Sequence, residues 1–170
     1  MGCSTLTGRK YSIGEIQSLL RQAGWPDVMV TDADGDSNPL IVVMSAIAIS
    51  ESSGYEGAHN ACGEDSYGLL QVNRDAWGGS WSADQLMQAL PNLQAAYTIY
   101  QRQGLRAWGP YITGIYANNM PAAQAAYQSG GGSLPVNTAS GGVLSSLGSS
   151  QNLILYSLGF ILLYLVLSDD

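Results

Sequence analysis

The sequence predicts a small, mainly helical α+β domain that is followed by a separate hydrophobic helix. Three observations indicate this arrangement. Apolar residues recur at helical spacing over residues 12–24, an apolar run follows Pro39, and two segments that begin near prolines look helical between residues 91 and 128. Beyond residue 128 the composition changes abruptly, so the helical domain is expected to fill residues 1–128.

The first expected helix covers residues 12–24. Ser12 and Glu15 form the S-x-x-E pattern of a capping box, in which each residue bonds to the backbone of the other. Gly24 and Pro26 are typical of the end of a helix. The apolar residues on one face are Ile13, Ile16, Leu19 and Leu20.

A second, buried helix is expected over residues 40–50, where nearly every residue is apolar. A buried strand would show the same composition, but the length, the alanines and Pro39 in the first turn favour a helix. Charge returns only at Glu51, and Gly54 follows as a stop signal.

The rest of the domain is predicted to alternate between loops and short helices. Residues 55–80 are rich in Gly, Asn, Asp and Ser, which predicts loops with a short hairpin around Leu69–Asn73. The remaining expected elements are a helix over 82–90 with Ser82 as its N-cap, a helix opened by Pro91 that runs to about Gly104, a short aromatic element over 108–116, and a last helix over 121–128.

A Gly/Ser-rich linker over residues 129–151 and a hydrophobic helix over 152–168 are expected to follow. At 1.5 Å per residue the segment 151–168 would span about 27 Å, which just reaches across a hydrocarbon core of about 30 Å. We therefore expect a transmembrane helix, with burial inside a protein assembly as the alternative.

The charged residues exclude several classes of function. The net charge is −7 with six Lys and Arg residues, which argues against binding to nucleic acid or to anionic lipid. His59 is the only histidine, so a Ser/His/Asp triad or a His-rich zinc site is hard to build. Cys3 and Cys62 are more readily explained as unrelated thiols than as a bridge, although the sequence leaves this open.

No metal or cofactor is expected. Residues 32–36 resemble the start of a calcium loop, but Ser37 stands where that loop needs Gly and Val43 where it needs a bidentate Glu. Capping of the helix that begins near Pro39 explains the aspartates of this segment instead.

Glu51 is the first candidate for chemistry. A carboxyl group at the end of an apolar helix is desolvated, which disfavours the charged form and raises the pKa. Glycosidic cleavage needs such a proton donor at neutral pH. The alternative is a glutamate at a helix end that simply faces water.

Three further segments could bind a sugar. Gln71 and Asn73 carry amides that both donate and accept hydrogen bonds, as acetamido and hydroxyl groups require. Tyr100, Trp108 and Tyr111 belong to two aromatic segments that suit the apolar faces of sugar rings. If each segment is considered by itself, a purely structural role explains it better. The first segment would be a turn followed by a strand, and the aromatic residues would pack in the core.

Together these segments resemble the lytic transglycosylase and goose-type lysozyme superfamily, the SLT domain, over residues 11–117. Within it the chain is most similar to the phage virion-associated type. The matching features are Glu51-Ser52, the Ser-x-Gly-Leu-x-Gln run over 66–71, the helix led by Asn92, and Tyr-x-x-Gly over 111–114. One departure is that many transglycosylases have Tyr-Asn-x-Gly where this chain has Tyr111-Ile112-Thr113-Gly114.

The resemblance implies a lysozyme-like fold whose cleft binds alternating N-acetylglucosamine and N-acetylmuramic acid. Glu51 would act as general acid and base in cleaving the β-1,4 bond of peptidoglycan between these sugars. The residues expected to bind substrate are Ser66, Tyr67, Gly68, Gln71, Asn73, Asn92, Tyr100, Trp108 and Tyr111.

The type of reaction depends on a second carboxylate. Inverting hydrolysis needs one to activate water, whereas transglycosylation proceeds with Glu51 alone. Asp65 is the best second carboxylate by its place in the cleft motif, and Glu64 is a weaker one. The sequence leaves both reactions open and favours a transglycosylase.

The expected setting is a phage virion, in which the enzyme opens the cell wall during genome entry. No apolar run follows Met1, so no secretory signal peptide is expected, and the hydrophobic segment would contact a membrane or virion proteins. One alternative is a tail-anchored membrane protein of a bacterium. Another is a catalytically inactive lysozyme-like module that binds glycan or builds a particle.

Overall fold

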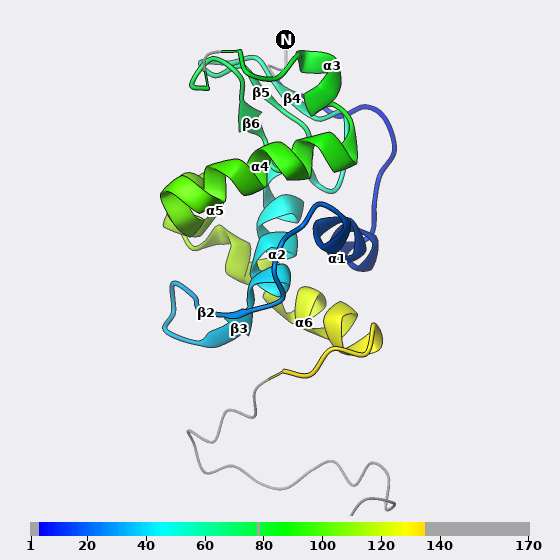
Figure 1. Cartoon of the computed structure of the whole chain (residues 1–170), viewed down its shortest axis with the longest axis vertical. Helices are drawn as coiled ribbons and strands as arrows, with labels where there is room; N and C mark the ends of the chain where they lie inside the picture. The colour runs from blue at the N-terminus through cyan, green and yellow to red at the C-terminus, as the bar shows by residue number, and fades with distance from the viewer. Residues whose placement is uncertain (1–3, 78, 135–170) are drawn as a thin grey trace, which may run out of the picture. The chain divides into compact units, whose positions relative to one another are not determined.

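Figure 1 shows the computed structural model of the chain, which describes residues 4–77 and 79–134. The hydrophobic helix expected over residues 152–168, and residues 135–151 of the expected linker, lie outside the described residues. Among the helices that are described, none combines the length and the apolar character that a membrane span requires.

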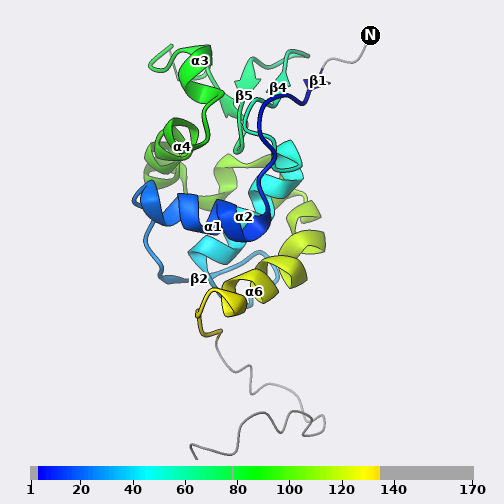
Figure 2. The same cartoon turned by 90° about the vertical axis from the view of Figure 1, so that its right-hand side faces the viewer.

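The helix α2 (Leu40–Ser52) is the central element of the fold. It contacts α1 (Ile13–Gln22), α6 (Met120–Ser129) and the 3-10 helix η2 (Ile115–Asn119), and it lies among the other helices in both views (Figures 1 and 2). A helix that is apolar on every side must be buried on every side, and residues 40–48 are all buried. The prediction of a buried helix rather than a strand is therefore confirmed.

The helix α1 begins as the sequence predicts. The Ser12 side chain accepts a hydrogen bond from the Glu15 backbone, and the Glu15 carboxylate accepts one from the Ser12 backbone at 2.8 Å. Ile16 and Leu20 are fully buried against α2. Between them, the buried Gln17 amide donates to the Ser45 hydroxyl and to the Ala123 carbonyl, which ties α1 to α2 and α6.

The helices after residue 80 differ from the prediction in their bounds. The expected helix over 82–90 is a single turn, α3 (Ala83–Leu86), and α4 (Ala89–Gln103) begins before Pro91 rather than at it. Pro91 is tolerated there because the first backbone N–H groups of a helix have no partner within the helix. The 3-10 helix η1 (Gly104–Ala107) and the short helix α5 (Gly109–Ile112) complete this part of the fold.

An antiparallel sheet of four two-residue strands packs beyond the C-terminal end of α2. Its order is β1 (Ser4–Thr5), β4 (His59–Asn60), β5 (Ser66–Tyr67) and β6 (Val72–Asn73). The hairpin β5–β6 was expected, whereas strands of two residues show no periodicity from which β1 and β4 could be predicted. Cys62, in the loop after β4, is disulfide-bonded, so the expectation of unrelated thiols is wrong for it.

A second hairpin, β2 (Met29–Thr31) and β3 (Ser37–Pro39), leads into α2. The sequence suggested that Asp32 caps α2, but it does not. The N-cap of α2 is Pro39, and no side chain makes a capping hydrogen bond there. The Asp32 carboxylate instead accepts from the backbone N–H groups of Asp34 and Asp36 and from the Asn38 amide, at 2.9–3.1 Å. Asp32 therefore holds the hairpin loop closed.

Asn92 joins α4 to the loop between β5 and β6. Its fully buried amide accepts from the Leu70 N–H at 2.9 Å and donates to the carbonyls of Tyr67 and Leu86 at 2.8 and 3.0 Å. Gly68 makes this approach possible, because a Cβ at this position, whose φ is +77°, would collide with the Leu86 carbonyl and the Asn92 amide.

We expect Asn92→Ala to lower the free energy of unfolding by about 3–5 kcal/mol, because three buried backbone groups would lose their partner. Urea denaturation measures this loss. Asn118→Ala is the matched control: this exposed side chain has no hydrogen bond within the described residues, so its removal should cost about 0.5 kcal/mol or less. Equal losses in the two variants would contradict the structural role of Asn92.

Candidate active site

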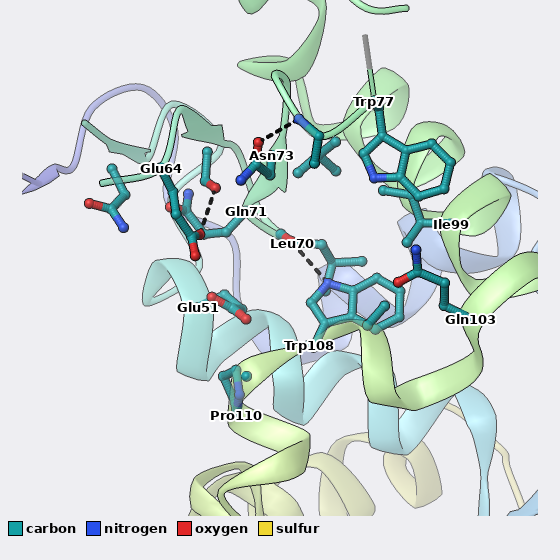
Figure 3. Close-up of a pocket in the computed structure, with 16 residues that line it drawn as sticks. Glu51, Glu64, Leu70, Gln71, Asn73, Trp77, Ile99, Gln103, Trp108 and Pro110 are labelled. Carbon is teal, nitrogen blue, oxygen red and sulfur yellow. Dashed lines mark hydrogen bonds between the residues drawn. The ribbon is translucent and has the colours of Figure 1, made fainter. Parts of the chain in front are cut away.

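A cavity of about 380 Å³ lies between the C-terminal end of α2, the sheet and the segment from α4 to α5 (Figure 3). Its volume lies in the range of small-molecule sites. Polar side chains come mainly from the sheet and its loops, and apolar ones come both from there and from α4 and the residues after it. The lining residues are Glu51, Asn60, Glu64, Ser66, Leu70, Gln71, Val72, Asn73, Ala76, Trp77, Ile99, Gln103, Ala107, Trp108, Gly109 and Pro110.

Glu51 reaches the cavity from the last turn of α2. The helix ends just beyond it, where Ser53 adopts a left-handed conformation with φ of 53°. Gly54 follows with φ of 85°, and its backbone lies so close to the Tyr11 carbonyl that a Cβ would be 2.6 Å from that oxygen. The chain therefore turns away sharply and leaves the half-buried Glu51 carboxyl facing the cavity.

Burial, followed by the negative charge of Glu64, raises the pKa of Glu51 to about 7. In the part of the chain that the structure describes, no hydrogen bond or ion pair reaches the Glu51 carboxyl to offset this. A substantial fraction of this group is therefore protonated at neutral pH, so it can give a proton to a ligand in the cavity.

Glu64 is the second carboxylate that lines the cavity. It lies in the loop before β5 and accepts a hydrogen bond from the Ser66 hydroxyl at 3.3 Å. Figure 3 shows the Glu64 side chain pointing into the same end of the cavity as Glu51. Glu64 is exposed, whereas Glu51 is half-buried, and the charge of Glu64 acts on the Glu51 carboxyl.

The polar wall contains Gln71 and Asn73. Gln71 adopts φ of 44°, and its amide donates to the carbonyls of Ala58 and Gly68 at 3.2 and 3.0 Å, which fixes its orientation. The Asn73 carbonyl oxygen accepts from the Ala76 N–H at 2.9 Å, which leaves the NH₂ group available to a ligand. The structure thus places both predicted amides at the cavity.

Trp108 forms an apolar part of the cavity lining. Only 4% of its surface is exposed, and its indole N–H donates to the Leu70 carbonyl at 3.0 Å. Trp108 lies between η1 and α5, and Leu70 lies in the loop between β5 and β6, so this bond joins two sides of the cavity, as the dashed line in Figure 3 shows. Trp108 therefore positions the cavity wall as well as lining it.

Asp65 does not line the cavity, although the sequence favoured it as the second carboxylate. It bonds to His59 at 3.1 Å and to Arg74 at 3.3 Å. Hydrogen bonds from Tyr67 and His59 hold the pKa of Asp65 below its usual value, which makes it a weak base. Tyr67 lies in this network, stacked on the His59 ring at 4.2 Å, and is likewise absent from the lining.

Four other predicted substrate-binding residues also lie outside the cavity lining. Gly68 and Asn92 join the loop to α4, as described above. Tyr100 packs on Trp25 with ring centroids 5.2 Å apart. Tyr111 packs on the buried Tyr116 and lines a separate pocket beside the Asp32 loop. Of the nine predicted binding residues, Ser66, Gln71, Asn73 and Trp108 line the cavity.

The sequence reasoning missed Trp77 and Gln103. Trp77 lies in the loop after β6 and Gln103 at the end of α4. The available signal for the first was the occurrence of Trp77 and Trp81 within a glycine-containing loop, where a core role is unusual. Gln103 gave no signal, because an isolated glutamine near the end of a helix is most often solvated.

The model of the family described as lysozyme like domain matches residues 29–113, which are 85 of the 170 residues. The comparisons with curated proteins and with solved structures found no match. The matched half of the chain contains Glu51, the strands β4–β6 and every other residue that lines the cavity. This chain belongs to the lysozyme-like domain family.

Proposed function

We propose that the protein cleaves the β-1,4 bond between N-acetylmuramic acid and N-acetylglucosamine in peptidoglycan, with Glu51 as general acid and base. Membership of the lysozyme-like family indicates a peptidoglycan glycosidase in general. The observation that carries the specific proposal is the Glu51 carboxyl, which has no partner among the described residues and faces the cavity with its pKa raised to about 7.

In the first step Glu51 donates its proton to the glycosidic oxygen while the bond from that oxygen to C1 of the muramic acid breaks. In the second step the Glu51 carboxylate accepts the proton of the C6 hydroxyl of the same muramic acid. The C6 oxygen then bonds to C1. The product is a 1,6-anhydro sugar, no water is consumed, and Glu51 returns to its protonated form. A group with a pKa near neutrality suits both roles.

The position of Asp65 supports this non-hydrolytic reaction, because the carboxylate that the motif favoured for activating water is bonded to His59 and Arg74. Glu64 provides the alternative. It lines the cavity beside Glu51, so a water held by Glu64 would make the enzyme a muramidase. In the transglycosylase, Glu64 acts only through its charge, which helps to keep Glu51 protonated.

A phage particle remains the setting that we propose, on the basis of the sequence alone. The proposal rests on the hydrophobic segment over residues 152–168, which lies outside the described residues. A tail-anchored bacterial enzyme and an inactive glycan-binding module of a particle are the alternatives.

We expect Glu51→Gln to lower the rate of release of soluble fragments from purified sacculi by about 10²–10⁴-fold, because the proton donor is lost. Wild-type protein that releases nothing would favour the inactive module, and a variant as active as wild type would exclude Glu51 as the acid.

The same variant offers a test of the buried carboxyl that is independent of activity. A raised pKa stabilises the fold below pH 4.5, the ordinary pKa of glutamate, and this stabilisation is lost as pH rises through about 7. Glu51→Gln should therefore be more stable than wild type at pH 8, on the order of 1–3 kcal/mol, with little difference near pH 4. Thermal denaturation at both pH values measures this, and a lower melting temperature at pH 8 would contradict it.

Glu64→Gln distinguishes the two reactions. Removing the Glu64 charge lowers the pKa of Glu51, so the loss of activity with rising pH should begin at lower pH than in wild type. Mass spectrometry of the digest should still find 1,6-anhydro ends, which are lighter than reducing ends by one water. Reducing ends from wild type, together with a loss of about 10²-fold or more in the variant, would establish hydrolysis with Glu64 as base.

A further inference from the structure

We propose that Trp77 and Gln103 form a sugar-binding subsite remote from the bond that is cut, and that this subsite makes the enzyme prefer long glycan strands. The inference rests on the proposed function, since it concerns the other end of the same cavity. Figure 3 shows Trp77 and Gln103 on the side of the cavity away from Glu51 and Pro110.

The Trp77 ring is half-buried and held in place by two neighbours. The Arg102 guanidinium lies over the indole at 5.3 Å from its centroid, and Trp81 packs against it at 6.3 Å with the planes inclined by 54°. Arg102 and Trp81 do not line the cavity, whereas Trp77 does. The contacts that orient the ring thus lie outside the cavity, and part of the indole is left for a ligand.

Gln103 supplies a polar group beside this ring. Its side chain is exposed, lines the cavity and makes no hydrogen bond within residues 4–77 and 79–134. The NH₂ group of Asn73 is also free of protein partners within that part of the chain. An amide that both donates and accepts suits the acetamido group of an N-acetylated sugar, which does the same.

The combination favours a sugar ring over other ligands. The C–H face of a pyranose is apolar and flat enough to cover an indole, while its edges carry the hydroxyl and acetamido groups that amides bind. Of the residues that the structure describes, no Lys or Arg lines the cavity, so an anion is not favoured there. A sugar at Trp77 is not the one whose bond breaks at Glu51, so it contributes binding energy rather than chemistry.

Strand length is the property that this subsite should control. A glycan that reaches both Glu51 and Trp77 gains the additional contact, whereas a short one that is cut at Glu51 does not. Trp77→Ala should reduce kcat/KM on long glycan strands by about ten-fold, which corresponds to ~1.4 kcal/mol. On the shortest oligosaccharide that wild type cleaves, it should change kcat/KM by about two-fold or less.

A binding measurement keeps this test separate from the proposed activity. In a Glu51→Gln background, calorimetric titration with the hexamer of N-acetylglucosamine should show about ten-fold weaker binding after Trp77→Ala. Trp77→Phe keeps a ring and should lose about three-fold or less, and Gln103→Ala should lose about three-fold. If wild type cleaves nothing while these affinities behave as expected, the function fails and the subsite stands.

Arg102→Ala and Arg21→Ala form a matched pair of controls. Each removes an arginine that lies 5.3 Å from the centroid of an aromatic ring. Arg21 lies over Tyr127, however, and neither of these two residues lines the cavity. Arg102→Ala should weaken hexamer binding by about three-fold, and Arg21→Ala should leave it unchanged.

Two results would overturn the proposal. One is hexamer binding that is unchanged by Trp77→Ala. The other is an equal loss of activity on short and long strands, which would place Trp77 at the cleavage point. Should Trp77→Ala fail to fold in a thermal melt, Trp77→Phe and the exposed Gln103→Ala decide the question, and unchanged affinity in both would reject the subsite.

Discussion

The enclosure of α2 is the constraint on which the rest of the structure depends. Residues 40–48 are buried on every side of α2, so the fold must supply neighbours all around them. The neighbours are α1, α6, η2, α5 and β3. The helix leaves the core only in its last turn. Glu51 lies at this boundary, where enough burial remains to raise its pKa and enough opening exists for a ligand to reach it.

The residues of the cleft motif divide into two groups with different tasks. Ser66, Gln71 and Asn73 line the cavity, whereas Gly68 and Asn92 hold the loop that carries them against α4. The second group is as necessary as the first, because a wall of polar side chains binds a sugar only if its backbone is fixed. The motif therefore extends along both the wall of the cavity and the backbone that supports it.

Glu51, Glu64 and Asp65 are three carboxyl groups in one region with three different environments. Burial and a like charge raise the pKa of Glu51, while hydrogen bonds from Tyr67 and His59 lower that of Asp65. Glu64 is exposed and lines the cavity together with Glu51, whereas Asp65 does not. The chemistry of each group follows from its partners and its solvation rather than from its residue type.

The sequence by itself determined the features that depend on local patterns: the capping box of α1, the buried α2 with Glu51 at its end, the β5–β6 hairpin, and the order of the motifs that indicate the family. Only the tertiary structure decided which neighbours of these motifs face the cavity. Adjacent residues of a strand point to opposite faces, so a shift of one residue in register exchanges the wall for the core. The pairing of β4 with β5 and β1 sets that register, and two-residue strands carry no periodic signal for it. Asp65, Tyr100 and Tyr111 do not line the cavity, whereas Trp77 and Gln103 do. The sequence could not separate these two groups, because their positions depend on contacts between segments far apart in the chain.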